Sequence, residues 1–376
     1  MKKILFITKS EMMGGIEKVL LELVSSLNRT KYEITVMTGE INDEIKENLP
    51  ADVQYKSLFK KRFRGLDRIL VHFPAVILHK IFVKDKYDVE ISFQEGYPTK
   101  IISGANERTK KICWFHNDPY YYDFNLPFFK NKKVLKENLE RFDKIISVSN
   151  FIAQGYKRYM NLNKEISVIY NSVDFQKIAE LATETVNDLT TDEDVFRICY
   201  VGRLSEEKRV DMLVKGIISL NKLYKNIELI IIGDGHKFSD ISNKVVTEKA
   251  QKYIKLLGYR KNPYPYIKRS SLLVCSSLTE SFCLVVAEAL ALGVPVLSTK
   301  CGGPEEILEN GNIGMLVEND LESLVLGIKE MINNRGLYSK YKNINFNQSI
   351  KYERNHIISQ IETILGEEAN EKSSVV

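Results

Sequence analysis

Short apolar runs that alternate with segments of helical periodicity limit most strongly what this chain can fold into. Near its start, a strand-like run at residues 3–8 is followed by a helix-like segment at 14–28 and a second strand-like run at 32–39. The helix-like segment places its apolar residues on one face, at Ile16, Val19, Leu20, Leu23 and Leu27. Further strand-like runs follow at 88–93, 110–115 and 144–149. This alternation predicts a doubly wound parallel sheet.

An acidic segment separates this series from a second one. Residues 182–196 hold five acidic residues, no basic residue and no periodic apolar pattern, which is typical of an exposed linker or edge loop. Strand-like runs then recur at 196–202, 227–233, 253–258, 272–277, 295–299 and 314–318. We therefore predict an α/β fold with two Rossmann-like doubly wound domains, over residues 1–180 and 195–345. A C-terminal helix near 346–366 is expected to pack back on the first domain.

Cysteine usage and the apolar stretches indicate the compartment. The five cysteines are odd in number, widely spread and form no C-x-x-C pair, so neither a disulfide framework nor a zinc site is indicated. The first apolar run, Ile4–Ile7, is shorter than the roughly 7 to 15 residues of a signal peptide core. The apolar stretch 69–83 is interrupted by His72, His79 and Lys80, and it falls short of the ~20 residues that span a bilayer. We expect a cytoplasmic protein that is soluble or bound to a membrane surface.

Basic charge is concentrated in residues 55–86. This segment holds nine basic and two acidic residues, a net charge of +7, whereas the whole chain carries +5. Its cations are interleaved with apolar residues such as Phe59, Leu66 and Phe73, as in amphipathic surfaces that bind anionic lipids. A solvated helix face is the alternative, and no nucleic-acid-binding motif accompanies the charge. The candidate membrane-surface residues are Lys60, Lys61, Arg62, Arg64 and Arg68.

The second domain begins with a candidate anion site. Gly202 ends its first predicted strand, and Arg203 and Lys208 follow before the next helix. Strand ends that face a helix N-terminus bind anions in open α/β sheets, and two fixed cations suit a diphosphate. The alternative is an ordinary surface loop in which Glu206 and Glu207 pair with these cations. A G-x-G at Gly233 and Gly235 lacks the third glycine of a dinucleotide fingerprint and adds little.

Two carboxylates stand in the apolar stretch TESFCLVVAEALALGVPV, at Glu280 and Glu288. A buried carboxylate without a partner costs several kcal/mol or more, so Glu288 in particular requires one. The periodicity predicts a helix over 282–292, which puts Glu280 in the preceding turn and Glu288 two turns inside. Eight residues of helical rise is about 12 Å, so the two carboxylates could contact opposite ends of one extended ligand. Two acids on a solvated helix face are the alternative.

Taken together and in order, the motifs GGIE, GRLSEEK, LLGY, ESFCLVVAEA and CGGPEEI resemble the retaining glycosyltransferases of the GT-B fold, specifically glycosyltransferase family 4. The resemblance covers nearly the whole chain, and its most specific part is the E-x7-E pair with Arg203 and Lys208. It implies that these two cations hold the diphosphate of a nucleotide-sugar. Glu280 would bind hydroxyls of the donor sugar, and Glu288 those of the ribose.

The resemblance also implies a role for His116, near the donor sugar at the inner edge of the first domain. The positions it implies for donor binding are Gly14, Gly15, Gly202, Gly258, Tyr259, Ser281, Phe282, Cys283, Leu284 and Glu288. Two positions depart from the pattern, because many members have glycine where this chain has Ser281 and Cys283. If the turn requires a positive φ at Ser281, serine would be strained there.

The resemblance implies a retaining transfer in which the leaving phosphate accepts the acceptor's proton, with a UDP-sugar as the favoured donor. We expect no cofactor and no metal, because the one D-x-D, Asp192 to Asp194, lies in the acidic segment ahead of a strand. The acceptor is expected to be a lipid-linked saccharide at the inner membrane face, used in capsule, wall or lipopolysaccharide assembly. A nucleotide-sugar epimerase and a non-catalytic nucleotide-sugar-binding protein stay open as alternatives. A dinucleotide-dependent dehydrogenase is the weakest alternative, since the glycine fingerprint is missing.

Overall fold

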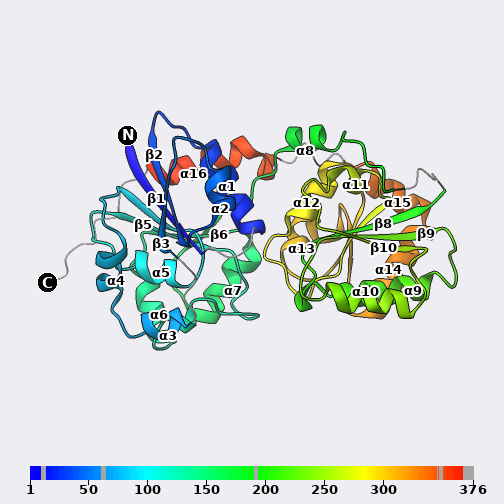
Figure 1. The fold of residues 1–376 in the computed structure, drawn as a ribbon, viewed down its shortest axis with the longest axis horizontal. Coiled ribbons are helices and arrows are strands. Elements are labelled where there is room, and N and C mark those ends of the chain that lie inside the picture. The colour runs from blue at the N-terminus through cyan, green and yellow to red at the C-terminus, as the bar shows by residue number, and fades with distance from the viewer. Residues whose placement is uncertain (10–13, 61–64, 190–193, 345, 347–349, 367–376) are drawn as a thin grey trace. The chain divides into compact units, whose positions relative to one another are not determined.

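The structure is a computed structural model that describes residues 1–9, 14–60, 65–189, 194–344, 346 and 350–366. The chain forms two units, an N-terminal unit of Met1–Ser172 with Arg354–Val376 and a C-terminal unit of Val173–Glu353. Each unit is built on one sheet whose paired strands are all parallel, with helices packed against it (Figure 1). The predicted fold class of two Rossmann-like parallel-sheet units is therefore confirmed.

The N-terminal unit has a seven-stranded sheet in the order β3-β2-β1-β4-β5-β6-β7. The central strand β1 pairs with β2 on one side and β4 on the other, with Ile4 opposite Ile34 and Val89. Residues Ile4–Ile7 are fully buried, as expected for a strand covered on both faces. The strands are β1 (Lys2–Thr8), β2 (Tyr32–Glu40), β3 (Gln54–Phe59), β4 (Val89–Ser92), β5 (Lys110–Phe115), β6 (Lys144–Ser147) and β7 (Ile166–Val168).

The helices of the N-terminal unit follow the predicted periodicity. Helix α1 buries Val19, Leu20 and Leu23, while Ile16 is only half-buried. The α-helices are α1 (Gly15–Ser26), α2 (Asp43–Asn48), α3 (Leu66–Leu70), α4 (Ala75–Phe82), α5 (Tyr97–Ile102), α6 (Lys132–Leu139), α7 (Asn150–Met160) and α16 (Arg354–Gly366), with a 3-10 turn η1 (Leu126–Phe128).

The C-terminal helix α16 belongs to the N-terminal unit. Lys110 Nζ donates to the carbonyl oxygen of Ile364 at 2.6 Å, and Lys2 Nζ donates to that of Gly366 at 2.8 Å. Two ammonium groups thus satisfy carbonyls at the end of the helix, where the helix dipole also favours positive charge. The helix begins at Arg354 and not near 346, because residues Ile350–Tyr352 form a 3-10 turn, η5, in the C-terminal unit.

The boundary between the units lies earlier than the predicted residue 180. Helix α8 (Phe175–Leu181) contacts α11 and α12 and so belongs to the C-terminal unit. Val173 N donates to the Tyr352 carbonyl oxygen at 2.8 Å, so the two chain crossings between the units run side by side. The described part of the acidic segment is not a free linker, since Asp188 pairs with Arg260 at 2.9 Å.

The C-terminal unit has a six-stranded sheet in the order β10-β9-β8-β11-β12-β13. Its strands are β8 (Phe196–Val201), β9 (Ile227–Ile232), β10 (Ile254–Gly258), β11 (Leu272–Cys275), β12 (Val296–Thr299) and β13 (Met315–Val317), and all six correspond to predicted runs. The chain winds outward from β8 to β10, returns to β11 beside β8, and then winds outward on the other side. The carboxyl ends of β8 and β11 therefore form a topological switch point, where open α/β sheets bind ligands.

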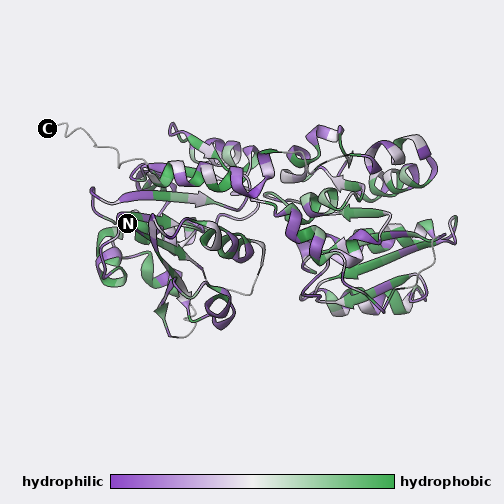
Figure 2. Cartoon of the chain, turned by 90° about the horizontal axis from the view of Figure 1, so that it is seen from above, coloured by the Kyte–Doolittle hydropathy of each residue, from purple (hydrophilic) through white to green (hydrophobic). Residues whose placement is uncertain are grey.

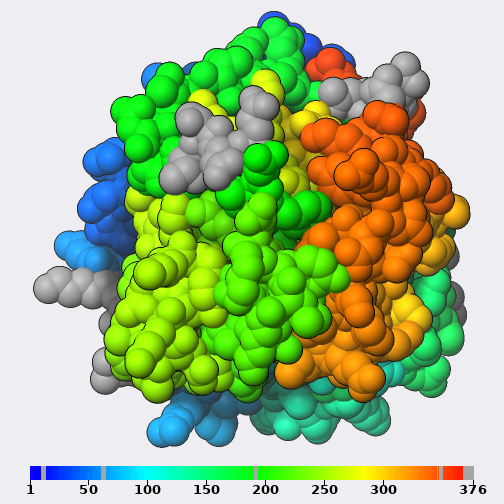
Figure 3. Space-filling view, turned by 90° about the vertical axis from the view of Figure 1, so that its right-hand side faces the viewer, coloured from blue at the N-terminus to red at the C-terminus, as the bar shows by residue number. Residues whose placement is uncertain are grey.

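Helices cover both faces of this sheet. They are η2 (Glu206–Lys208), α9 (Val210–Leu220), α10 (Phe238–Thr247), α11 (Tyr264–Lys268), α12 (Leu284–Ala291), α13 (Gly303–Ile307), η3 (Glu309–Gly311), α14 (Leu321–Asn333) and α15 (Arg335–Lys342). Helix α9 packs against α14 and α10, and in Figure 3 the green segment of α9 lies between yellow-green α10 and orange α14.

Apolar side chains fill the space between these layers. Figure 2 shows the strands largely in the green of hydrophobic residues, while the helices carry purple on parts of their surface. The core of the C-terminal unit joins residues of β8 and β9, such as Ile198 and Leu229, to Leu213 of α9 and Leu324 of α14. Among the described residues, no helix combines the length and apolar character needed to cross a membrane.

Candidate functional site

The loops after β8 and β11 meet at the switch point of the C-terminal unit and bring the predicted cation and carboxylate together. Lys208, in η2, places its Nζ 2.7 Å from Glu280 Oε1. The Ser277 hydroxyl donates to the same oxygen at 2.7 Å. The two charged side chains are 23% and 12% exposed, so the ion pair is largely shielded from water. Sequence reasoning identified both residues, but it did not identify their direct contact or the role of Ser277.

The Lys208 ammonium is held in its charged form. Burial by itself lowers the pKa of Lys208, but the Glu280 carboxylate beside it more than offsets this, so the pKa is raised above its ordinary value of 10.5. Lys208 is therefore a fixed positive charge at any physiological pH. The alternative in which Glu206 and Glu207 neutralise the local cations is wrong, because Glu206 pairs with Lys237 at 2.9 Å and Glu207 accepts from the Ser205 hydroxyl.

Backbone hydrogen bonds fix the position of Glu280. Its N–H donates to the Cys301 carbonyl at 2.7 Å, and its own carbonyl accepts from Gly303 N at 2.8 Å. A parallel bridge between Glu280 and Gly302 thus continues the pairing of β11 with β12 beyond the strand ends. A Cβ at Gly303 would lie 2.5 Å from Phe282 Cα, so glycine is required there for this close approach. The loop formed by Cys301, Gly302 and Gly303 therefore helps to orient Glu280.

Gly202 and Gly233 allow the β8 and β9 ends to pack backbone against backbone. A Cβ at Gly233 would lie 1.9 Å from the Gly202 carbonyl oxygen, and its φ of +142° also disfavours a side chain. Arg203 follows Gly202 and is exposed, and its guanidinium makes no hydrogen bond or ion pair to any residue that the structure describes. The loop therefore presents one fixed cation, Lys208, and one unpaired cation, Arg203.

Cys283, not Ser281, takes the positive φ in the turn before α12. Cys283 caps the helix with φ of +74°, a left-handed conformation that costs a non-glycine residue about 1–2 kcal/mol. Ser281 has no such conformation. The expected strain at Ser281 is thus misplaced by two residues. Leu284 starts the helix and leaves N–H groups of its first turn without intrahelical acceptors, while the Phe282 ring is buried near Tyr352.

Glu288 lies two turns inside α12 and has a partner within the protein. Its carboxylate is buried, and the Tyr264 hydroxyl of α11 donates to Glu288 Oε1 at 2.9 Å. The sequence indicated that Glu288 needs a partner. It did not indicate that Tyr264 is this partner, because no spacing rule links residues 264 and 288. Gly258 ends β10 at the same edge of the sheet and accepts from Gly233 N at 2.9 Å, and Tyr259 beside it is 67% exposed.

In the N-terminal unit, His116 follows β5 and is buried with an unusual partner set. Glu95 Oε1 accepts from the backbone N–H groups of His116 and Asn117 at 2.7 and 2.8 Å, and Asn117 Nδ2 donates to Oε2 at 2.7 Å. Burial lowers the pKa of His116 to about 3, so its imidazole is neutral. Among the described residues its Nε2 atom has no hydrogen-bond partner. Sequence reasoning missed Glu95, although a carboxylate directly after the strand run 88–93 was a usable signal.

Gly14 and Gly15 stand at the start of α1. Gly14 N donates to Glu17 Oε2 at 3.0 Å, so Glu17 takes over part of the capping of this helix. A Cβ at Gly15 would meet no atom within 4 Å, so the packing of the described residues does not require glycine there. Residues 10–13, in the preceding loop, lie outside the described residues.

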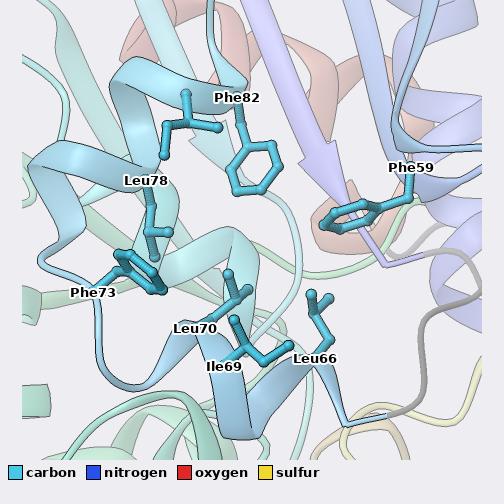
Figure 4. Close-up of a pocket in the computed structure, with 8 residues that line it drawn as sticks. Phe59, Leu66, Ile69, Leu70, Phe73, Leu78 and Phe82 are labelled. Atoms are coloured by element: carbon cyan, nitrogen blue, oxygen red, sulfur yellow. The ribbon is translucent and has the colours of Figure 1, made fainter.

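The basic segment forms an apolar pocket with an exposed rim. A hollow of about 230 Å³ between β3, α3 and α4 is lined by Phe59, Leu66, Ile69, Leu70, Phe73, Leu78, Ile81 and Phe82 (Figure 4). Ile69, Phe73, Val76, Ile77 and Ile81 are 43–48% exposed. Lys60 and Arg68 are exposed nearby, as are Lys80 and Lys84, whereas Lys61, Arg62 and Arg64 lie outside the described residues.

Comparison with known proteins identifies related chains. Residues 13–177 match the family Glycosyltransferase Family 4, and residues 182–348 match the family Glycosyl transferases group 1. An uncharacterized glycosyltransferase of Methanocaldococcus jannaschii is 31% identical over 335 residues, 86% of each chain. A second one from this organism is 30% identical over 223 residues, and the match spans only about half (52%) of that relative.

A relative with a described reaction comes from Campylobacter jejuni. The N-acetylgalactosamine-N,N'-diacetylbacillosaminyl-diphospho-undecaprenol 4-alpha-N-acetylgalactosaminyltransferase is 24% identical over 339 residues, 88% of this chain and 90% of the relative. Among solved structures, Anabaena HepE in complex with UDP and glucose superposes with a TM-score of 0.75 at 19% identity, over 97% of this chain and 99% of HepE. This structural likeness confirms the predicted GT-B fold. Because a relative of 31% identity matches over most of both chains and the two family matches follow one another along the sequence, the chain belongs to the group 1 glycosyltransferases, with an N-terminal unit of glycosyltransferase family 4 type.

Proposed function

We propose that the protein transfers a hexosyl or N-acetylhexosaminyl group from a nucleotide-sugar, with UDP as the favoured nucleotide, to a saccharide acceptor with retention of configuration. The observation that carries the proposal is the shielded Lys208–Glu280 ion pair at the switch point, 2.7 Å between the charged atoms. In such a pair, the Lys208 ammonium can bind an anion and the Glu280 carboxylate can accept hydrogen bonds from the hydroxyls of a sugar. The complexes of HepE with UDP support the choice of nucleotide.

Lys208 and Arg203 act on the leaving diphosphate. The Lys208 ammonium stays charged because Glu280 raises its pKa, and the Arg203 guanidinium makes no competing hydrogen bond or ion pair among the described residues. Positive charge fixed where negative charge develops lowers the barrier without reorganisation of the site. When the anomeric C–O bond to phosphate breaks, these two groups stabilise the nucleoside diphosphate that leaves.

Glu280 positions the sugar. Its Oε1 atom is taken up by Lys208 and Ser277, whereas Oε2 accepts no hydrogen bond from any described residue. Oε2 can therefore accept a hydrogen bond from a donor-sugar hydroxyl. The acceptor oxygen attacks the anomeric carbon, and its proton passes to the departing phosphate oxygen. Glu288 offers a carboxylate for the ribose hydroxyls.

The reaction is proposed to need no metal. In the D-x-D segment, Asp192 lies outside the described residues, and Asp194 precedes β8 (Phe196–Val201) at its amino end. The site at Lys208 and Glu280 lies at the carboxyl ends of β8 and β11, which is the opposite edge of the sheet. Asp194, the acid of this segment that the structure describes, thus lies at the edge of the sheet opposite the anion site, which supports a reaction without a metal.

We propose a lipid-linked acceptor at the inner membrane face, in cell-surface polysaccharide assembly. The α3 and α4 segment lines the apolar pocket of Figure 4 and exposes apolar side chains at its rim. Lys60, Arg68, Lys80 and Lys84 of the same stretch of chain are exposed, and this is the composition of surfaces that bind anionic bilayers. The name of the Campylobacter jejuni relative includes a diphospho-undecaprenol acceptor, which supports the same class of acceptor here. The enzyme would then work in the cytoplasm as a peripheral membrane protein.

The transferase is tested with a panel of nucleotide-sugars, scoring released nucleotide with and without lipid-extract acceptor. We expect that one of the donors gives nucleotide release and that adding acceptor increases the rate of this release. The rate should fall at least a hundredfold in Lys208→Ala and in Glu280→Gln. Lys215→Ala is a matched control, since Lys215 is exposed on α9 and its ion pair among the described residues is with Asp211 in the same helix. Acceptor-independent conversion of the donor would favour the epimerase, and binding without release a non-catalytic protein.

The membrane surface is tested separately by flotation with anionic vesicles. Neutralising Lys60, Lys61, Arg62 and Arg64 is expected to abolish flotation. A charge-matched control neutralises Lys222, Lys225, Lys249 and Lys252, which are exposed in the C-terminal unit. Unchanged flotation of the first variant would remove the membrane proposal and leave the transferase reaction untouched.

A further inference from the structure

Two thiols stand beside Glu280 at the switch point. Cys275, the last residue of β11, has its Sγ 3.9 Å from Cys283 Sγ and 4.0 Å from Glu280 Oε1. The sulfur atoms of both cysteines and a carboxylate oxygen of Glu280 all lie within 4.8 Å of one another. We propose that Cys275, Cys283 and Glu280 form a binding site for a thiophilic divalent cation of the zinc class, and that the bound cation inhibits the enzyme.

The spacing of the sulfur atoms fits a tetrahedral cation. With Zn–S bonds of about 2.3 Å, two thiolates of a tetrahedral site stand about 3.8 Å apart. The observed separation of 3.9 Å is close to this value, so the two sulfurs need no rearrangement to bind. Three protein ligands leave a fourth position for water or another ligand, as in open zinc sites.

The charges around the cluster also balance. Two thiolates and one carboxylate contribute three negative charges, and a divalent cation with the Lys208 ammonium contributes three positive ones. Lys208 is bound to Glu280 Oε1, so Oε2 can ligate the cation while the ion pair remains. Lys208 then acts as a charged group that orients a ligand carboxylate, as outer-shell partners of metal ligands do.

Access to the two sulfur atoms is from one side. Cys275 is buried at the strand end, but Cys283 is only partly buried, so a cation can reach the pair from the side of Cys283.

The backbone holds both thiols in place. Cys275 lies in β11, between β8 and β12, and Cys283 is set by its left-handed conformation at the start of α12. A cluster held on a strand end and a helix start is more rigid than one held on a loop, which favours metal binding. The inhibition rests on the proposed function, since the cation would occupy the Glu280 oxygen assigned to the donor sugar. The site itself does not.

Cobalt(II) is the probe for the site, in the full-length protein kept reduced with a phosphine. We expect one equivalent of Co²⁺ to give a thiolate-to-cobalt charge-transfer band and the intense visible bands of four-coordinate cobalt. Zn²⁺ should displace it. The charge-transfer band and the visible bands should all be lost in Cys283→Gly. This variant should fold, because glycine suits the φ of +74° at position 283. Cys113→Ala, with its thiol in β5 of the other unit, is the matched control.

The second arm compares nucleotide release by each variant with and without Zn²⁺. The zinc concentration for half inhibition should rise at least about tenfold in Cys283→Gly relative to wild type, because even outer-shell changes weaken metal sites by that factor. No charge-transfer band in wild type, or an equal band in Cys283→Gly, overturns the site. A band without zinc inhibition of an active enzyme overturns the inhibitory role. Failure of the proposed function is seen independently, as no nucleotide release by the metal-free enzyme.

Discussion

The Lys208–Glu280 ion pair makes a prediction about stability that does not depend on knowing the substrate. Removing one partner of a fully buried ion pair costs about 3–5 kcal/mol, and an exposed pair is worth about 1 kcal/mol or less. With side-chain exposures of 23% and 12%, the pair lies between these limits. We expect Lys208→Met to lower the free energy of unfolding of the C-terminal unit by about 2 kcal/mol.

A double-mutant cycle isolates the pair. Glu280→Gln keeps an oxygen that accepts from Lys208 and Ser277, so it should cost about 1 kcal/mol. In the double variant Lys208→Met/Glu280→Gln, the loss should fall short of the sum by a coupling energy of about 1.5 kcal/mol. A coupling below about 0.5 kcal/mol would mean that the ion pair is not formed in solution and would refute the reasoning.

Urea unfolding followed by two signals measures the cycle. The chain has a single tryptophan, Trp114, in β5 of the N-terminal unit. Its fluorescence therefore reports the N-terminal unit, and circular dichroism reports both. The substitutions should move the transition seen only by circular dichroism and leave the tryptophan transition in place. A shift of both would point to a general loss of stability and not to the pair.

The pH dependence of the pair has a definite sign. The pKa of Lys208 is raised in the folded protein, so its contribution is fully present below the ordinary value of 10.5 and is lost as the pH rises through the higher folded value. The difference in stability between wild type and Lys208→Met should be constant around neutrality and shrink only above about pH 10.5.

Three further predictions concern other parts of the structure. His116 should stay neutral down to about pH 4, because burial lowers its pKa to about 3, and nuclear magnetic resonance titration of the ring should show no protonation between pH 5 and 8. Gly233→Ala should destabilise the C-terminal unit by about 3 kcal/mol or more, since its Cβ would lie 1.9 Å from the Gly202 carbonyl oxygen. Gly15→Ala, with open space around the new Cβ, should cost less than about 1 kcal/mol. Equal costs of the two substitutions in urea unfolding would contradict the packing described. Lys110→Met should loosen the end of α16, because it removes the 2.6 Å hydrogen bond to the Ile364 carbonyl oxygen. We expect faster hydrogen exchange in residues 354–366 than in wild type. Lys144→Met, on the neighbouring β6, is the control.

Local patterns were sufficient for the elements themselves. The runs 196–202 and 227–233 became β8 and β9 because short, mostly apolar runs suit a strand covered on both faces. Helix α12 likewise follows from periodicity over 282–292, although it begins at Leu284. The predicted domain boundary was wrong by about one helix. Helix α8 joins the C-terminal unit because it packs on α11 and α12, and these contacts cannot be predicted from the residues of α8 alone.

The candidate site was only partly readable in advance. Lys208 and Glu280 were singled out from local patterns, and the family resemblance gave them their roles. Ser277 and Tyr264 carry no local mark of their roles. The positive φ of Cys283 is another example, since cysteine has no special preference for that conformation and the turn imposes it. Each of these features depends on a neighbour that is distant in the chain or on the path of the backbone.

The amino-acid sequence by itself determined the two alternating α/β series, their parallel sheets and the concentration of cations in 55–86, because periodicity and composition are properties of short windows. The tertiary structure decided that Lys208 meets Glu280 across 72 positions of the chain, that Cys275 lies 3.9 Å from Cys283, and that α16 returns to the first unit. The physical reason is the strand order. Only when β8 and β11 become neighbours do their end loops converge, and that adjacency is a balance of packing over the whole sheet.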